Sequence, residues 1–256
     1  MGPSNLGPRE AKGAPDHPHR GFETVTYVIA GYFEHKDSQG HSGKLGPGDV
    51  QWMTAGSGLI HSEMPQNNFL QTGGKLHLLQ LWVNLPMRDK KIKPHYQDTR
   101  AEKIPIGRTS DGLVSVRVIA GEALGAHAII DTRTPITYLH LTIQPGGGIV
   151  HQVPKEFNTF AYVIGGGNGG GIFGSKEKNG DEKLAKRGQI VLFARDGDKV
   201  SIRNPMNAGL PIDVLLIAGL PLNEPVAHYG PFVMNTQEEI YQAIDDYRNG
   251  RLDKLL

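Results

Sequence analysis

The sequence predicts an all-β protein built from two related barrels, with one helix near the C-terminus. Glycine and proline are abundant, with 34 and 17 of the 256 residues, and residues of these two types join short strands through turns. Runs of β-branched and aromatic residues recur in both parts of the chain. Their spacing is irregular but lies near that of sandwiches and barrels.

The composition excludes several classes of protein. Lysine and arginine together number 27, and aspartate and glutamate 26, which argues against the concentrated basic surface that nucleic-acid binding requires. The chain has no cysteine, so a disulfide scaffold, a cysteine nucleophile and a cysteine-ligated zinc site are excluded. Neither a membrane span nor a signal-peptide core is evident. We expect a soluble cytoplasmic protein that contacts neither nucleic acid nor membrane.

The first part of the chain begins with a predicted loop over residues 1–16, where glycine and proline recur. Strands are then expected at residues 22–30, 50–53 and 76–84. The last of these is so apolar that it should be buried on both faces. Residues 86–112 are polar and contain prolines, so they form the expected connection between domains. We place an N-terminal barrel at residues 1–104 and a C-terminal barrel with the terminal helix at residues 105–256.

The second part repeats the first in outline. Its strands are expected at residues 114–120, 136–143, 160–164, 189–193, 200–203 and 212–218. A Pro-Gly-Gly-Gly turn precedes His151, but the position two residues later is Val153, so this barrel is predicted to lack a metal site. The helix is signalled by Thr236 and Glu239, which form a capping box, and by an apolar face at positions 240, 243, 244 and 247.

Two short patterns in the first part predict a metal site. His17 and His19 are two residues apart, and so are His61 and Glu63. On an extended strand, such pairs point to the same face, and Pro18 favours an extended conformation for the residue before it. Two adjacent strands would bring three imidazoles and one carboxylate together. Iron, manganese, cobalt, nickel and copper all suit these ligands, whereas structural zinc sites depend on cysteine.

Other candidate residues have weaker support. Glu23 shares the parity of His17 and His19, but Gly21 lies between them and can break the strand. His35 and His41 flank a turn and are expected to be structural or exposed. The run of glycines at residues 165–171 contains a nominal G-x-G-x-x-G, but no helix follows it. A dinucleotide site is therefore not expected, and the run is interpreted as a hairpin loop.

The motifs around the predicted ligands resemble those of the pirin family. The resemblance rests on DHPHRGFETVTY from Asp16, on PGDVQWMTAG from Pro47 and on HSEMP from His61. It covers the chain from about Gly7 to Arg248, with additional matching blocks at residues 81–85, 121–125 and 230–236. Compared with the family, few residues precede His17, and the chain stops soon after the terminal helix. A truncated or divergent member is therefore expected.

The resemblance implies a bicupin, which consists of two double-stranded β-helix (jelly-roll) barrels. A single mononuclear iron would lie in the first barrel, with His17, His19, His61 and Glu63 as its ligands. Glu23 would then be a supporting residue. We expect Fe(II), with manganese, nickel, cobalt, copper or zinc as alternatives.

The resemblance also implies one of two functions. The first is a dioxygenase that opens the ring of a flavonol such as quercetin with O₂ and releases carbon monoxide. Glu63 would be the catalytic base, and Phe22, Trp52 and Met53 are candidates to line the pocket. The alternative is an iron-dependent, redox-sensing protein that regulates transcription through a protein partner, with a nuclear pool if the chain is eukaryotic. We expect a monomer.

Overall fold

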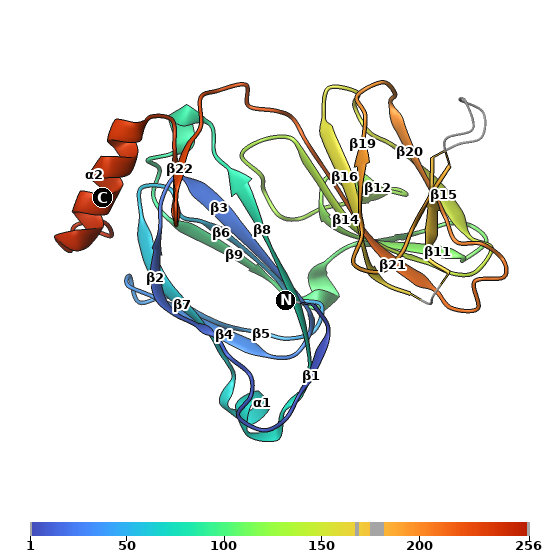
Figure 1. Ribbon diagram of the computed structural model, residues 1–256, viewed down its shortest axis with the longest axis horizontal. Helices are drawn as coiled ribbons and strands as arrows, with labels where there is room; N and C mark the ends of the chain where they lie inside the picture. Colours follow the sequence, from blue (N-terminus) through green and yellow to red (C-terminus); the bar gives the residue numbers. More distant parts are fainter. Residues whose placement is uncertain (1, 167–168, 175–181, 255–256) are drawn as a thin grey trace. The chain divides into compact units, whose positions relative to one another are not determined.

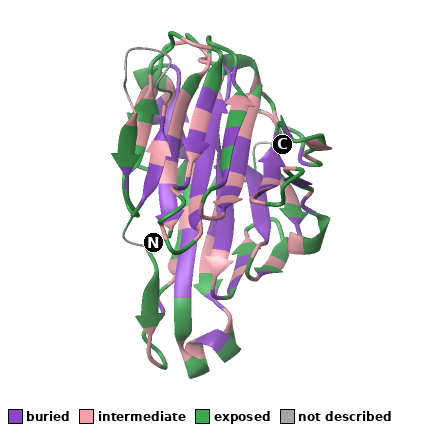
Figure 2. Ribbon diagram, turned by 90° about the vertical axis from the view of Figure 1, so that its right-hand side faces the viewer, coloured by how far each residue is buried: buried purple, intermediate pink, exposed green. Residues whose placement is uncertain are grey.

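The computed structural model describes residues 2–166, 169–174 and 182–254, and it confirms the predicted all-β class (Figure 1). The chain divides into two compact units. The first unit combines residues 1–103 with residues 222–256, and the second unit comprises residues 104–221. In the view of Figure 2, buried residues concentrate along the long central strands, and most turns are exposed or half-buried.

The first unit contains two main antiparallel sheets. The five-stranded sheet has the order β1 (Ser4–Leu6), β8 (Gly74–Asn84), β3 (Phe22–Ala30), β6 (Val50–Thr54) and β9 (His95–Thr99). The four-stranded sheet has the order β2 (Ala14–His19), β7 (Leu59–Pro65), β4 (Phe33–Asp37) and β5 (Ser42–Leu45). The connecting segments contain α1 (Asn67–Thr72) and the 3₁₀ turns η1 (Met87–Asp89) and η2 (Ala101–Lys103).

The last part of the chain, residues 222–256, completes the first unit. It contains β22 (Ala227–Tyr229), β23 (Phe232–Met234) and α2 (Gln237–Arg248). Buried side chains of β23 and α2 form one apolar cluster with Leu252, and Ile60 of β7 packs against that cluster. The sequence placed residues 222–256 in the C-terminal domain 105–256. In the structure they belong to the first unit instead, because they bury their apolar face on the first barrel.

The capping box of α2 is present as predicted. The Thr236 hydroxyl accepts from the backbone N–H of Glu239, and the Glu239 carboxylate accepts from the backbone N–H of Thr236. Ile240 and Ala243 of the predicted apolar face are fully buried, while Tyr247 is exposed. The helix ends at Arg248, and Gly250 follows with a φ of 62°, a conformation that favours glycine.

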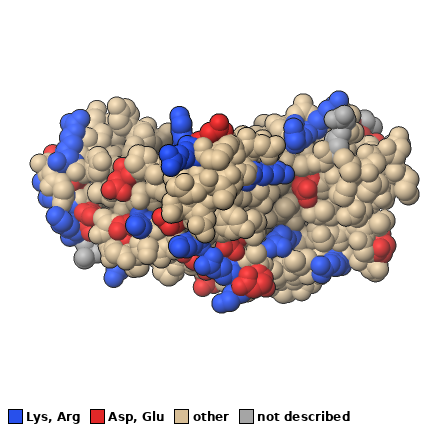
Figure 3. Space-filling model, turned by 90° about the horizontal axis from the view of Figure 1, so that it is seen from below, with Lys and Arg blue, Asp and Glu red and all other residues tan. Residues whose placement is uncertain are grey.

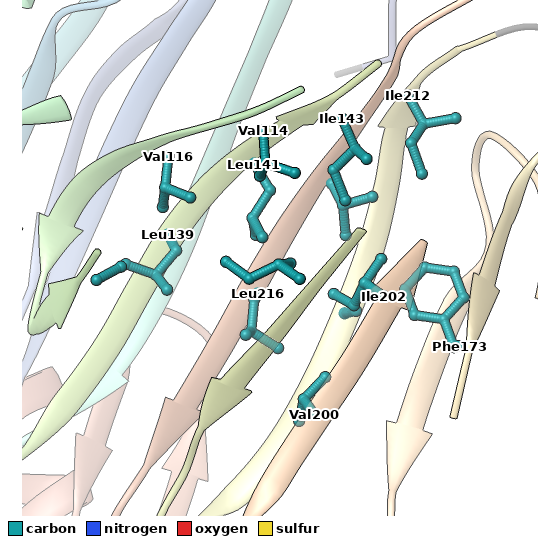
Figure 4. Packing of buried hydrophobic residues seen from close by; sticks show 14 of the residues in the cluster. Val114, Val116, Leu139, Leu141, Ile143, Phe173, Val200, Ile202, Ile212 and Leu216 are labelled. Carbon is teal, nitrogen blue, oxygen red and sulfur yellow. The ribbon is translucent and has the colours of Figure 1, made fainter. Parts of the chain in front are cut away.

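The second unit repeats the two-sheet arrangement. Its six-stranded sheet has the order β10 (Ile106–Arg108), β11 (Val114–Ala120), β14 (Ile136–Ile143), β21 (Ile212–Gly219), β16 (Asn158–Gly165) and β19 (Ile190–Phe193). Its four-stranded sheet has the order β15 (Gly148–Gln152), β20 (Lys199–Arg203), β17 (Gly171–Phe173) and β18 (Lys183–Ala185). A small hairpin joins β12 (Glu122–Ala123) to β13 (Ala126–His127). Figure 4 shows the apolar side chains from both main sheets that fill the space between them.

Most predicted strands are present within a few residues, and three expectations need correction. The predicted loop 1–16 contains β1, which pairs with β8, and the start of β2. The predicted connection 86–112 contains β9, which adds to the edge of the first sheet by pairing with β6. Strands β1 and β9 lie at the two edges of the five-stranded sheet. Edge strands are often polar, so their composition resembles that of a loop.

Strand β8 is the third correction. The sequence predicted burial on both faces, but only residues 76–78 of this strand are buried, and Trp82 is 43% exposed. The far end of β8 therefore presents an aromatic side chain to solvent.

On the face of the molecule that Figure 3 displays, basic and acidic side chains are interspersed. Across the described residues, no helix has the length and apolar character needed to span a bilayer. The glycine run connects β16 to β17, but Gly167 and Asn168 lie outside the described residues, so the predicted hairpin loop stays a prediction.

Candidate metal centre

Three of the four predicted ligands, His17, His19 and His61, meet because β2 and β7 are neighbouring antiparallel strands. His17 is the register partner of His61, and His19 is that of Leu59. The ring centroid of His17 lies 4.7 Å from that of His19 and 4.5 Å from that of His61. The rings of His19 and His61 are 5.1 Å apart. Three imidazoles from two strands therefore converge on one place.

These three histidines are the one group of three or more metal-type side chains found in the described part of the chain. Their candidate ligand atoms all lie within 4.8 Å of one another. Imidazole nitrogens are suitable ligands for iron, nickel, copper and zinc. The donor set therefore fits a divalent transition metal.

The backbone orients His17, the most exposed of the three. Its Nδ1 lies 2.8 Å from the carbonyl oxygen of Pro15. A carbonyl only accepts, so Nδ1 carries the proton and Nε2 keeps its lone pair. Fixing one ring nitrogen in this way prepares the other for a metal. His17 is therefore held by both neighbouring prolines: the Pro15 carbonyl oxygen orients its ring, and Pro18 favours an extended backbone at His17.

His19 and His61 are buried and neutral. Their side chains are almost inaccessible, and none of their four ring nitrogens has a hydrogen-bond partner of normal geometry among the described residues. Burial lowers the pKa of His19 to about 3, an effect that His17 strengthens and the Pro231 backbone opposes. Burial also lowers the pKa of His61 to about 2, and the neighbouring imidazoles act in the same direction. Uncharged imidazoles with free lone pairs are the form that binds metal.

Glu63, the fourth predicted ligand, lies two residues from His61 on β7. Its carboxylate accepts from Thr26 Oγ1 at 3.1 Å and from Gln80 Nε2 at 3.0 and 2.9 Å. These donors come from β3 and β8 of the facing sheet. Glu63 is not a member of the three-histidine group, so its role as a ligand stays a prediction.

Glu23 is turned away from the cluster. It is buried, and its carboxylate accepts from Thr54 Oγ1 at 2.6 Å. Glu23 lies on the face of β3 opposite to Thr26, because neighbouring side chains alternate. The parity argument fails at Gly21, whose φ of 84° redirects the chain between the two sheets.

Of the three residues predicted to line the pocket, only Phe22 lies beside the histidine cluster. Phe22 lies beside the cluster, with its ring 5.1 Å from that of His19. Trp52 pairs with Val25 on the face that carries Glu23, so it does not line the site. Met53 is fully buried against Ala55 and Leu59, which leaves it no surface for a substrate.

Trp82 was not singled out by the sequence. Its ring lies 5.7 Å from that of His19 and 4.4 Å from that of Phe22, and it remains partly exposed. Its indole N–H donates to Gln80 Oε1 at 3.2 Å, while the amide nitrogen of Gln80 donates to Glu63. The exposed aromatic ring is thereby linked to the carboxylate. Only the sheet pairing reveals this arrangement, since β8 alone looked like a core strand.

A small apolar cavity adjoins Glu63. It measures about 50 Å³ and is lined by Ala14, Thr26, Phe33, Glu34, His35, Leu45, Glu63 and Leu78. His35 is buried, and its Nε2 contacts Asp98 at 3.1 Å. The expected structural role of this histidine is consistent with that contact. His41 is exposed and pairs with Asp37.

Comparisons with known proteins agree with the fold and the site. The profile of the pirin family matches residues 1–83, and that of the pirin C-terminal cupin domain matches residues 138–253. Over 239 residues, the chain is 46% identical to pirin-like protein 2 of Arabidopsis thaliana, covering 93% of this chain and 70% of that protein. It is 44% identical over 240 residues to pirin of Homo sapiens, covering 93% and 77%.

Among solved structures, the chain resembles a quercetin 2,3-dioxygenase from Acinetobacter baumannii. The two share 36% identity and a TM-score of 0.86, over 98% of this chain and 83% of that one. The bicupin architecture expected from the sequence is thus supported. The profile of the C-terminal cupin domain includes residues 222–253. In the structure, these residues belong to the first compact unit.

Proposed function

Because this chain belongs to the pirin family, we propose that it is a metal-dependent dioxygenase that opens the ring of a flavonol such as quercetin with O₂. The cluster of His17, His19 and His61 carries the proposal, because its imidazoles converge, and none of the ring nitrogens of buried His19 and His61 has a hydrogen bond of normal geometry in the described chain. The similarity to a quercetin 2,3-dioxygenase supports the substrate class.

The three imidazoles would hold one divalent metal, and Glu63 is the proposed fourth ligand. Fe(II) is our first choice, and manganese, nickel, cobalt, copper and zinc are the alternatives. When bound, such a metal supplies Lewis-acid stabilisation to the oxyanion of the flavonol 3-hydroxyl group. The proposal needs no further cofactor.

Glu63 is the proposed base. A carboxylate within reach of the 3-hydroxyl group accepts its proton. Thr26 and Gln80 donate to this carboxylate, and such hydrogen bonds fix the direction in which its remaining lone pairs point. Trp82 in turn fixes the Gln80 amide, because its indole N–H needs the amide oxygen.

The substrate is proposed to bind at Trp82 and Phe22. The cavity of about 50 Å³ beside Glu63 is smaller than the roughly 300 Å³ or more of typical ligand sites. The partly exposed indole of Trp82 offers an aromatic surface near His19, where a planar ring can stack or pack edge to face. In the reaction, one O₂ is consumed, both its atoms enter the opened product, and one ring carbon leaves as carbon monoxide.

The proposal is tested by turnover of a defined substrate. Metal-free protein is loaded under nitrogen with Fe(II), and in parallel with manganese, nickel, cobalt or copper. O₂ consumption and loss of quercetin absorbance are then followed together. We expect turnover with at least one metal, and its loss in His61→Ala. Glu63→Gln keeps the three imidazoles, so it should bind the metal more weakly than the wild type, and it should lose most of kcat even at saturating metal, because an amide cannot accept the proton.

Two outcomes would overturn the proposal. One is metal-loaded protein that consumes no O₂ with quercetin, and the other is a His61→Ala variant that turns over like the wild type. Bound iron without turnover would favour the alternative, in which the oxidation state of iron controls binding to a protein partner.

A further inference from the structure

Strand β2 carries two of the three clustered imidazoles and lies at the edge of its sheet. Among the described strands it pairs with β7 alone, and its register shifts between Ala14 and His17. An edge strand leaves one row of backbone groups without a partner in the sheet. The positions of His17 and His19 therefore depend on what supports the other side of β2.

The C-terminal segment, residues 222–256, provides that support. The backbone N–H of Arg20 donates to Pro231 O at 3.4 Å, and that of Val233 donates to Arg20 O at 3.1 Å. This forms a parallel bridge between Arg20 and Phe232. Pro18, between the two ligands, lines the same groove as Phe232. The segment therefore bonds to the residue directly after His19 and shares a groove with Pro18.

Lys90 adds a second connection at the same corner. Its Nζ donates to the carbonyl oxygens of Gly21 and Val233, each at 2.8 Å, and to Asn84 Oδ1 at 2.7 Å. The side chain is almost inaccessible. The predicted inter-domain connection thus supplies a buried cation that joins the chain after β2 to the C-terminal segment.

Arg20 connects both ligand strands to α2. It directly follows His19, and its Nε donates to the Ser57 carbonyl oxygen at 2.6 Å, in the turn that leads into β7. Its Nη1 pairs with Asp246 Oδ2 at 2.9 Å, and both side chains are about 5% exposed. Asp246 is itself held by Gln242 at 2.9 Å and Arg251 at 3.3 Å. The carboxylate on α2 therefore fixes the guanidinium that joins β2 to the start of β7.

The same segment covers the turn at residues 56–58. A side chain at Gly58 would lie 2.5 Å from Leu252 O, so the chain after α2 packs directly on this turn. Ile60, the residue before His61, packs against the apolar cluster of β23 and α2. Both ligand strands are thus held from outside by the end of the chain.

We infer that Asp246 is a positioning residue for the metal centre, and that through Arg20 it sets the relative placement of His19 and His61. The inference concerns metal affinity and needs no substrate, so it goes beyond the proposed dioxygenase activity. Removing a partner that orients a ligand typically weakens metal binding by about 10–100-fold.

The test compares Asp246→Asn with Asp245→Asn, because Asp245 is the adjacent residue and forms an exposed pair with Arg251. Co(II) is titrated into metal-free protein without substrate, and quenching of Trp82 emission gives the Kd. The chain has two tryptophans, and a Trp82→Phe variant identifies the emission of Trp82. We expect Asp246→Asn to raise the Kd by about tenfold or more and to change the visible spectrum of bound Co(II). Asp245→Asn should match the wild type.

A wild-type Kd and Co(II) spectrum in folded Asp246→Asn would overturn the inference. Loss of one member of a buried ion pair can also unfold a protein, so circular dichroism is measured first. If Asp246→Asn is unfolded, Arg20→Lys is the second variant, because it keeps the charge but loses the Nε donation to Ser57. It should weaken Co(II) binding as well, and an unchanged Kd there would equally overturn the inference. Failure of quercetin turnover would leave this result unaffected.

Discussion

The two units have similar two-sheet barrels but fill them differently. In the second unit, the space between the sheets holds apolar side chains such as Val116, Leu141 and Leu216 (Figure 4). In the first unit, the facing strands direct His61 and Glu63 from one sheet and Gln80 from the other into the site. The same barrel fold can therefore enclose either apolar side chains or a polar site. The residue types at a few inward-facing positions decide which of the two the interior contains.

His151 of the second unit shows that a single half-buried histidine is compatible with an apolar barrel interior. It follows Ile149 and precedes Val153 at two-residue spacing, and both of these neighbours belong to the apolar core. Burial lowers the pKa of His151, as it does for His19 and His61. Within the described residues, however, no group of metal-type side chains includes it. One inward imidazole without partners at the right spacing does not make a metal site.

The largest expected effect is the loss of metal from the first barrel alone. His61→Ala removes one of three convergent imidazoles, so its cost should exceed the roughly 10–100-fold that loss of an orienting partner causes. Metal content after dialysis against Fe(II) or Co(II) is the measurement. His151→Ala is the matched control and should retain the wild-type metal content. Equal metal loss in both variants would contradict the asymmetry between the barrels.

A core truncation tests the apolar filling of the second barrel. Leu141 is fully buried, and Leu141→Ala should lower the free energy of unfolding by about 2–5 kcal/mol, through lost transfer energy and a cavity. Urea denaturation followed by circular dichroism measures the change. Leu192→Ala removes a side chain that is 79% exposed in the same unit and should have little effect. Similar losses in both variants would mean that the interior of this barrel is not tightly packed.

Acid should destabilise the metal-free protein through the first barrel. In the folded state the pKa of His19 is about 3 and that of His61 about 2, whereas unfolded histidine titrates near 6.5. Below about pH 6.5 the unfolded chain therefore binds more protons, and stability falls as pH decreases towards these values. Each histidine contributes at most about 1.4 kcal/mol per pH unit.

Chemical denaturation of the metal-free protein between pH 7 and pH 4 measures this dependence. His61→Leu removes one of the two buried groups and should have a clearly smaller slope. A slope equal to that of the wild type would show that these imidazoles are not the groups that titrate on unfolding.

The smallest expected effect concerns Gln80. Gln80→Leu removes the donor to Glu63 and the acceptor for Trp82, so kcat for quercetin should fall by about tenfold, comparable with other losses of an orienting hydrogen bond. KM and metal content should change little. Gln189→Leu is the control, because the hydrogen bond of that glutamine side chain is to the backbone N–H of Lys186 in the second unit. Unchanged kcat in Gln80→Leu would remove Gln80 from the proposed mechanism.

Local patterns in the sequence predicted much of the fold. Residues 22–30, 114–120 and 136–143 were expected as strands and are observed with those bounds. The capping box at Thr236 was equally readable, because its two partners are three residues apart. The family resemblance supplied the bicupin arrangement and is borne out.

The errors have one common cause. Strands β1 and β9, the exposed end of β8 and the docking of α2 all depend on partners far away in the chain. An edge strand with polar residues has no distinctive local signature, and Lys90 in a polar stretch gave no sign that it would be buried. Trp82 was hidden in an apolar run, although it is exposed beside His19.

The sequence by itself determined that His17 and His19, and likewise His61 and Glu63, share a face, because the two-residue period of a strand is a local property of the backbone. Only the tertiary structure decided that three of these side chains meet and that Glu63 is held by Gln80. It also decided that Arg20 is fixed by Asp246 from the end of the chain. Those contacts join segments far apart in sequence, and their positions follow from sheet pairing and burial, which no local pattern specifies.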